Sequence, residues 1–213
     1  MKGYEEEQEH REEAAALSVK IAMAVAMSDG SLDDAEGNKI KEWIKKNISF
    51  YGDQKKKELK DLYNNAMKEA YQLAKKDDLI LSKLTKRLNE IGDKKSKYDT
   101  VELCYEVMGA DGVADPEEIK TINNISKSLN LDANELEKMR DKQMMNISSD
   151  ISVSSLEETL GIDPTWSKEK IKTFLINEFQ KWNGRINSVS DENERKNIQS
   201  RLDDIAKLRK KYE

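Results

Sequence analysis

Hydrophobic residues recur along most of the chain at the three- and four-residue spacing of an amphipathic helix. Leu17, Ile21 and Val25, for example, share one side of a segment that reads as a single helix over residues 4–28. The same spacing predicts further helices at residues 33–49, 53–76, 77–91, 97–109, 115–129, 132–145, 155–161, 167–183 and 190–212. No segment alternates clearly as a strand would, so we expect an all-α fold.

One helix junction is marked with particular clarity, between Met108 and Glu118. Gly112 can adopt the left-handed conformation that ends a helix. Asp115 suits the N-cap of the next helix, Pro116 suits its first position, and Glu118 stands where a capping-box acid belongs. The stretch therefore predicts a helix end, a tight turn and a helix start.

The same junction occurs earlier in the chain, at residues 27–36. When Asp111 is aligned with Asp29, Asp115 falls on Asp33 and Glu118 falls on Glu36. Hydrophobic positions upstream and downstream match at the same offset. This agreement predicts a duplicated helical bundle.

A serine-rich stretch at residues 146–155 lacks helical periodicity and is the best candidate for a linker. It divides the chain into a helical domain at residues 1–145 and a smaller helical domain at residues 156–213. The first domain begins with about ten polar residues that we expect to fray. The second is expected to contain three helices.

Charge and composition narrow the classes of function. The net charge of −5 argues against nucleic acid as the main partner, because phosphate binding needs a basic surface. The longest apolar run, residues 21–27, is far shorter than the ~20 residues that span a bilayer. A single cysteine, Cys104, suits a reducing compartment. We therefore expect a cytoplasmic protein without a membrane span.

The acidic residues of the two junctions are candidate metal ligands. If the repeats pack about a pseudo-twofold axis, their carboxylates could converge and bind Ca²⁺ or Mg²⁺ through oxygen. The alternative is that these acids only cap helices, which is the commoner use of this pattern. The six candidate ligands are Asp29, Asp33, Glu36, Asp111, Asp115 and Glu118.

Signals for enzymatic chemistry are missing from the sequence. His10 is the only histidine and Cys104 the only thiol, so neither has a partner at a metal-ligand or catalytic spacing. No glycine-rich phosphate loop occurs. We expect a protein that is not an enzyme.

The two Asp-Gly junctions resemble those of the TerB family, small helical domains named for tellurite resistance. The resemblance rests on residues 21–30 and 104–113, with Pro116, Glu117 and Glu118 following the second junction. It implies a duplicated helical arrangement. It also implies a stress-response or defence context, since TerB-like domains accompany tellurite and anti-phage systems.

The C-terminal segment resembles a J-domain, as found in DnaJ-like proteins. Residues 160–164 followed by Trp166 and Ser167 match the opening of that fold, and the domain order is similar to that of DjlA-type proteins. A working J-domain carries His-Pro-Asp after its long helix, whereas this chain has Asn183, Gly184 and Arg185. The reversed charge predicts that ordinary stimulation of Hsp70 is lost.

Basic residues on the long C-terminal helix form a second candidate site. Lys168, Lys172, Lys181 and Arg185 lie where the resemblance places the partner-binding face of J-domains, and they could hold an acidic protein. The alternative is a solvated face balanced by neighbouring acids.

These patterns together favour a non-enzymatic cytoplasmic adaptor that acts through protein–protein contacts, with partners that the sequence does not identify. Two alternatives stay open. The first is an Hsp70 co-chaperone with a non-standard J-domain, and the second is a divalent-metal-binding protein that uses the acidic helix starts.

Overall fold

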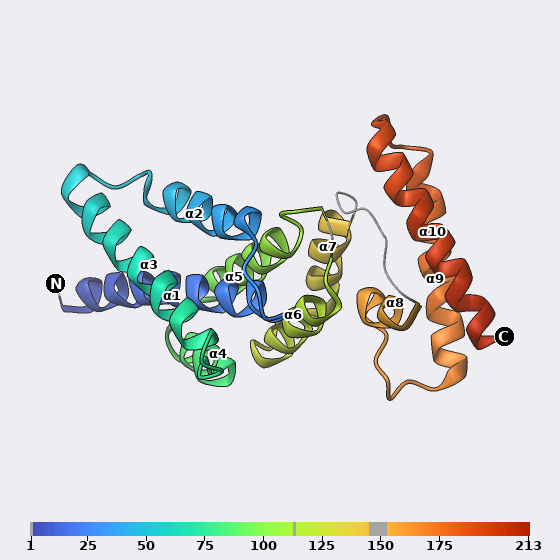
Figure 1. Ribbon diagram of the computed structural model, residues 1–213, viewed down its shortest axis with the longest axis horizontal. Helices are drawn as coiled ribbons and strands as arrows, with labels where there is room; N and C mark the ends of the chain where they lie inside the picture. Colours follow the sequence, from blue (N-terminus) through green and yellow to red (C-terminus); the bar gives the residue numbers. More distant parts are fainter. Residues whose placement is uncertain (1, 113, 145–152) are drawn as a thin grey trace.

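The computed structural model describes residues 2–112, 114–144 and 153–213, and within these ranges it contains helices and connecting turns but no strand (Figure 1). The expectation of an all-α fold is confirmed. The helices are α1 (Lys2–Ala26), α2 (Asp34–Ile48), α3 (Asp53–Ala74), α4 (Leu81–Ile91), α5 (Lys94–Met108), α6 (Pro116–Ser128), α7 (Ala133–Met144), α8 (Val153–Leu160), α9 (Lys168–Ile186) and α10 (Glu192–Tyr212).

Helix α1 is the centre of the larger helical unit. It contacts α2, α3, α4, α5 and α6, and its second half is buried on almost every side. Val19, Ile21 and Val25 are completely enclosed. A helix surrounded in this way must be apolar all round, which explains why residues 21–27 form the longest apolar run of the chain.

The two repeats pack about a pseudo-twofold axis. Helices α1 and α5 lie against each other, α2 packs on α5, and α6 packs on α1, as such an axis requires. The hydroxyls of Ser18 and Thr100, residues 82 positions apart, meet at 2.7 Å. Each hydroxyl also bonds a carbonyl four residues earlier in its own helix, that of Ala14 or Ser96. Equivalent residues touch only near a symmetry axis, so the duplication inferred from the junctions is a structural one.

Helices α8, α9 and α10 enclose a separate core around the completely buried Leu175, Trp182 and Ile205. The long helices α9 and α10 pack side by side, and α8 covers one end of α10 while also touching α6 (Figure 1). The predicted linker at 146–155 falls largely outside the described residues, and α8 begins within it, at Val153. The division into domains stays a prediction.

Most predicted helix starts and stops are confirmed at the level of individual atoms. Asp33 and Glu36 form a complete capping box, Asp115 accepts from the Glu117 amide, and Ser167 accepts from the Lys170 amide. Gly30 and Gly112 adopt the left-handed conformation, with φ of 95° and 83°.

Two predicted boundaries are wrong. Helix α9 does not end at Asn183 and Gly184 but continues to Ile186, because Trp182 and Ile186 on either side pack against the core and hold this segment helical. Asp77 and Asp78 do not cap α4, which begins at Leu81. Instead Asp77 takes a left-handed φ of 55°, and the Asp78 amide bonds the Leu73 carbonyl, so these residues close α3.

Candidate functional site

The acidic junction residues mostly bond to their own helix starts. Asp33 accepts from the Ala35 amide at 2.6 Å, and Glu36 accepts from the Asp33 amide at 2.8 Å. Asp29 accepts from the amide and hydroxyl of Ser31. These bonds satisfy donors that a helix start or turn leaves free, so each carboxylate already has a structural use.

The two capping-box acids nevertheless meet across the pseudo-twofold axis. Glu36 and Glu118 are 8% and 4% exposed, and their carboxyl groups lie close to each other. Burial raises the pKa of Glu118 to about 9, and the neighbouring Glu36 carboxyl and its negative charge add to the rise. Burial also raises the pKa of Glu36, against the opposing effect of the neighbouring Glu118 carboxyl. The pair therefore holds a proton on Glu118 at neutral pH.

This pair is only part of the convergence that metal binding would need. Within the described ranges, no three side chains of the His, Cys, Asp and Glu types come close enough together to hold a metal ion. Asp29 and Asp111 are exposed in their turns, whereas Glu36 and Glu118 are enclosed. Binding of Ca²⁺ or Mg²⁺ by the six acids stays a prediction.

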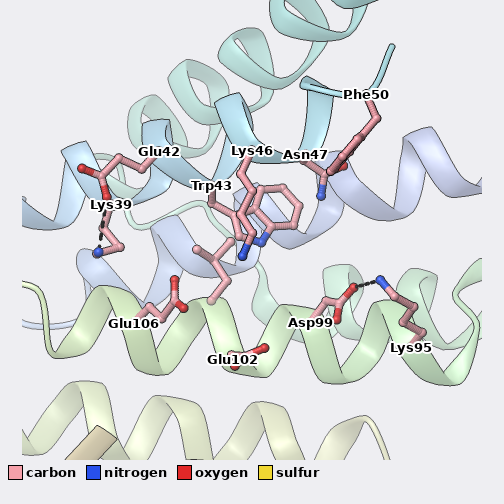
Figure 2. A pocket seen from close by; sticks show the side chains of 11 residues that line it. Lys39, Glu42, Trp43, Lys46, Asn47, Phe50, Lys95, Asp99, Glu102 and Glu106 are labelled. Carbon is pink, nitrogen blue, oxygen red and sulfur yellow. Dashed lines mark hydrogen bonds and ion pairs between the residues drawn. The ribbon is translucent and has the colours of Figure 1, made fainter. Parts of the chain in front are cut away.

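A groove of about 430 Å³ runs between α2 and α5 (Figure 2). Half-buried Trp43 lies in its middle, above the buried side chain of Leu103. Lys39 and Lys46 stand on the α2 side, facing acidic residues of α5. The acids on α5 are Asp99, Glu102 and Glu106.

Some charges of the groove are paired and others are available. Lys95 bonds Asp99 at 2.6 Å, and Lys39 pairs with Glu42 at 3.3 Å. Within the ranges that the structure describes, Lys46 and Glu106 have no ion-pair partner. A second hollow of about 720 Å³ shares Trp43 and Asp99 with the groove and extends it towards the first half of α1.

The position of Cys104 does not suit a reactive thiol. Its thiol is completely buried in α5, and burial raises its pKa. A thiol that stays protonated and out of reach of solvent is a packing residue.

Comparison with protein families gives a match over residues 11–141 to the family described as tellurite resistance protein TerB. This range covers both repeats and more than half of the chain. The chain belongs to the TerB family. The comparisons with curated proteins and with solved structures found no match. The TerB match indicates a function of the tellurite-resistance type, and it does not extend to the C-terminal unit.

No helix in the described part of the chain is both long enough and apolar enough to cross a membrane.

The last helix of the TerB match binds the C-terminal unit through a cluster of charges. Asp141 of α7, with only 4% of its side chain exposed, pairs with Lys181 at 2.9 Å and with Arg185 at 3.6 Å. Lys181 also bonds Glu137 of α7 and Glu178 of α9. Burial disfavours the charged form of Lys181, but its carboxylate hydrogen bonds outweigh this and raise its pKa.

The neighbouring Arg140 reinforces this connection. Its guanidinium donates to the Leu160 carbonyl at the end of α8, at 2.7 Å. That carbonyl would otherwise lack a partner, because it belongs to the last turn of its helix. The charge cluster and this cap together join the TerB domain to the C-terminal unit.

The four basic residues predicted to bind a partner thus fall into two groups. Lys181 and Arg185 contact the TerB domain of the same chain. Lys168 is exposed, and Lys172 lies near the final residue, with its ammonium 3.5 Å from the Glu213 carbonyl. The structure brings the first two together around Asp141 and leaves Lys168 apart from them.

The sequence did not predict that several residues of these sites would take part in them. Asp141, Arg140 and Glu137 lie on a short, mostly polar helix where any of them could have faced solvent. Trp43 packs against the core and is also half-exposed in the groove. Only the packing of distant helices reveals these roles. Glu178 and Lys181, three residues apart on α9, do have the spacing of an intrahelical ion pair.

Proposed function

We propose that this TerB-family chain is a non-enzymatic cytoplasmic adaptor in a stress-response or defence system of the tellurite-resistance type. It acts by binding a protein partner in the groove between α2 and α5. The observation that carries the proposal is the position of Trp43, half-exposed between lysines of one helix and carboxylates of another.

This arrangement has the features of a protein-binding surface. Aromatic side chains in partly enclosed positions supply much of the binding energy at interfaces, while surrounding charges select the partner and steer its approach. Lys46 and Glu106 have opposite charges and stand on opposite sides. A partner segment with a hydrophobic residue flanked by one acid and one base would satisfy both.

The chemistry of the groove supports a binding role rather than catalysis. His10 and Ser18 both border the adjoining hollow, which raises the question of a nucleophile and its base. However, the Ser18 hydroxyl is buried and bonded to the Ala14 carbonyl and to Thr100. A hydroxyl in this position is unavailable for attack on a substrate.

The adaptor proposal can be tested by capture of the partner from the organism that encodes the chain. A tagged full-length chain would be cross-linked in cells exposed to tellurite, together with Glu106→Lys and with Lys168→Glu as a matched charge reversal outside the groove. We expect one protein to be captured by the unaltered chain and by Lys168→Glu, and about tenfold less of it by Glu106→Lys. Equal capture by all three chains would contradict the proposal.

The resemblance of α8–α10 to a J-domain supports a co-chaperone only weakly. Arg185, which stands in place of the aspartate of His-Pro-Asp, pairs with Asp141 within the chain. Because its guanidinium is held in this contact, Arg185 offers no negative charge to the cationic surface that the aspartate of a working J-domain would meet. Stimulation of Hsp70 ATP hydrolysis by the full chain would favour the co-chaperone alternative.

One observation favours the metal-binding alternative, namely the meeting of Glu36 and Glu118 between the two acidic junctions. Calorimetric titration with Ca²⁺ and Mg²⁺ of the unaltered chain and of Asp29→Asn/Asp111→Asn tests it. Binding heat that the double substitution removes would support a metal site. An absence of both binding heat and thermal stabilisation would end this alternative.

A further inference from the structure

The most exposed large hydrophobic side chain in the described ranges is Phe50, in the turn between α2 and α3. Its side chain is 93% exposed, whereas the next such residue, Ile80, is 44% exposed. Single exposed hydrophobic residues are ordinary on protein surfaces. A phenylalanine that buries almost nothing has no packing role, so its position calls for another explanation.

The turn holds Phe50 in this outward position. Ile48 before it is buried, and Tyr51 after it packs against the core. The Ser49 hydroxyl donates to the Lys46 carbonyl, and the Tyr51 amide donates to the Ile48 carbonyl. Because residues on both sides are fixed, Phe50 stays at the end of the two helices (Figure 2).

Lysines surround a hollow of about 450 Å³ at this same end of α2 and α3. Lys45 comes from α2, and the other three lie within about one turn of α3. Four lysines thus face a single aspartate, with Ile48 in the hollow between them. The residues that line it are Lys45, Ile48, Asp53, Lys56, Lys57 and Lys60.

These lysines are available to a ligand. All four are exposed, and within the described part of the chain none of them forms an ion pair. Lys55, in contrast, points away to Glu12 of α1 and is paired at 2.8 Å. Asp53 stands in the first turn of α3, where the helix N-terminus stabilises its charge and reduces its effect on the lysines.

We propose that this end of the molecule, formed by Phe50 and the four lysines, docks on the surface of an anionic lipid bilayer. The ammonium groups would contact lipid headgroups while the aromatic ring enters the boundary between headgroups and acyl chains. One aromatic ring and four lysines provide weak, reversible binding that salt reduces. Phe50 also lines one end of the partner groove, whereas the four lysines lie outside it.

A bilayer fits this surface better than a nucleic acid does. Binding along a phosphate backbone needs a continuous row of cations. Here the lysines of α3 span only about one helical turn, and the exposed acids Glu42 on α2 and Glu58 and Asp61 on α3 lie beside them and interrupt the positive surface. A protruding hydrophobic side chain also suits insertion into a lipid interface.

Co-sedimentation of the full chain with vesicles tests the proposal. We expect binding to vesicles of mixed phosphatidylcholine and phosphatidylglycerol, and none to phosphatidylcholine alone. Phe50→Ser and Lys56→Gln/Lys60→Gln should each weaken binding by about tenfold, and Phe50→Trp should retain it. Higher ionic strength should release the unaltered chain.

Matched control variants test whether vesicle binding depends on this surface or on any exposed hydrophobic or basic residue. Ile176→Ser removes an exposed hydrophobic residue of α9, and Lys83→Gln/Lys86→Gln removes two exposed lysines of α4. Neither should change vesicle binding, and Glu106→Lys in the groove should not weaken it. Thermal unfolding would verify that each variant folds.

Three results would overturn the proposal. The first is an absence of binding to anionic vesicles at low ionic strength. The second is an equal loss of binding in the control variants. The third is binding of a fluorescent oligonucleotide, removed by Lys56→Gln/Lys60→Gln, by a chain that does not bind vesicles; this result would assign the surface to nucleic acid.

Discussion

The carboxyl groups of Glu36 and Glu118 lie close to each other although the two residues belong to different repeats. They occupy equivalent positions, each three residues after the aspartate that begins its helix. Two buried carboxyls this close to each other are not readily ionised together, and the raised pKa of Glu118, caused first by its burial, identifies it as the group that keeps the proton. The duplication thus places an acid from each repeat at the axis that relates them.

The first prediction concerns pH. Because the pKa of Glu118 is about 9 in the folded chain and near 4.5 when unfolded, its contribution to stability is complete below pH 4.5 and is lost as the pH rises to about 9. Glu118→Gln should mimic the protonated acid and stabilise the chain at pH 9, by roughly 1–3 kcal/mol. Denaturant unfolding at several pH values measures this effect.

The neighbouring Glu117→Gln provides the control, since Glu117 is exposed and pairs with Lys120 in the same helix. This substitution should change the free energy of unfolding by less than about 0.5 kcal/mol. A lower stability of Glu118→Gln than of the unaltered chain at pH 9 would contradict the proton on Glu118.

The second prediction concerns the contact between the TerB domain and the C-terminal unit. Asp141→Asn removes the carboxylate that pairs with both Lys181 and Arg185. We expect a loss of roughly 2 kcal/mol, which is less than for a fully buried pair because both cations keep partial contact with water. Faster hydrogen exchange of α7 and of α9 near Lys181 should accompany it.

Glu135→Gln on the same helix is the matched control. Glu135 pairs with Lys138 on the surface, with 52% and 69% of the two side chains exposed. Its removal should leave stability and exchange almost unchanged. If Asp141→Asn behaved like this control, the charge cluster would have no part in holding the two units together.

The third prediction concerns the hydroxyl pair at the axis. Ser18→Ala and Thr100→Val should each cost about 1 kcal/mol, since each removes one side of a buried hydrogen bond. The double substitution should cost about 0.5–1 kcal/mol less than the sum, because it leaves no unpaired hydroxyl. A thermodynamic cycle from denaturant unfolding gives this coupling, and simple additivity would show that the two hydroxyls do not interact.

The fourth prediction concerns Cys104. Its complete burial predicts that a thiol reagent reacts with the folded chain at least about 100-fold more slowly than with the unfolded chain. The rate of labelling with and without denaturant measures this difference. Rapid reaction of the folded chain would reopen a role for this thiol in chemistry.

The sequence predicted local features well and long-range contacts poorly. Asp33, Asp115 and Ser167 were recognised as caps because a cap depends on only a few adjacent residues. The end of α9 was misjudged because the packing of Trp182 outweighs the weak helix propensity of Gly184. A local preference is decisive only where tertiary contacts do not oppose it.

The candidate sites likewise divide into features that the sequence predicted and long-range contacts that it did not. The repeat offset indicated that acids of the two junctions would approach each other if the repeats packed about an axis, and Glu36 and Glu118 do lie close together. The partner of Arg185 could not be foreseen, because Asp141 reaches it through the packing of two helices from different parts of the chain. The groove around Trp43 likewise depends on how α2 lies against α5.

The central claim is that the groove between α2 and α5 binds the partner through which this TerB-family chain acts. Its most direct test is tellurite resistance in a strain that lacks the chain, restored with the unaltered protein, with Glu102→Lys/Glu106→Lys, or with Lys168→Glu/Lys172→Glu at equal abundance. We predict that the groove variant fails to restore resistance and that the α9 variant restores it. Full resistance with the groove variant would contradict the claim.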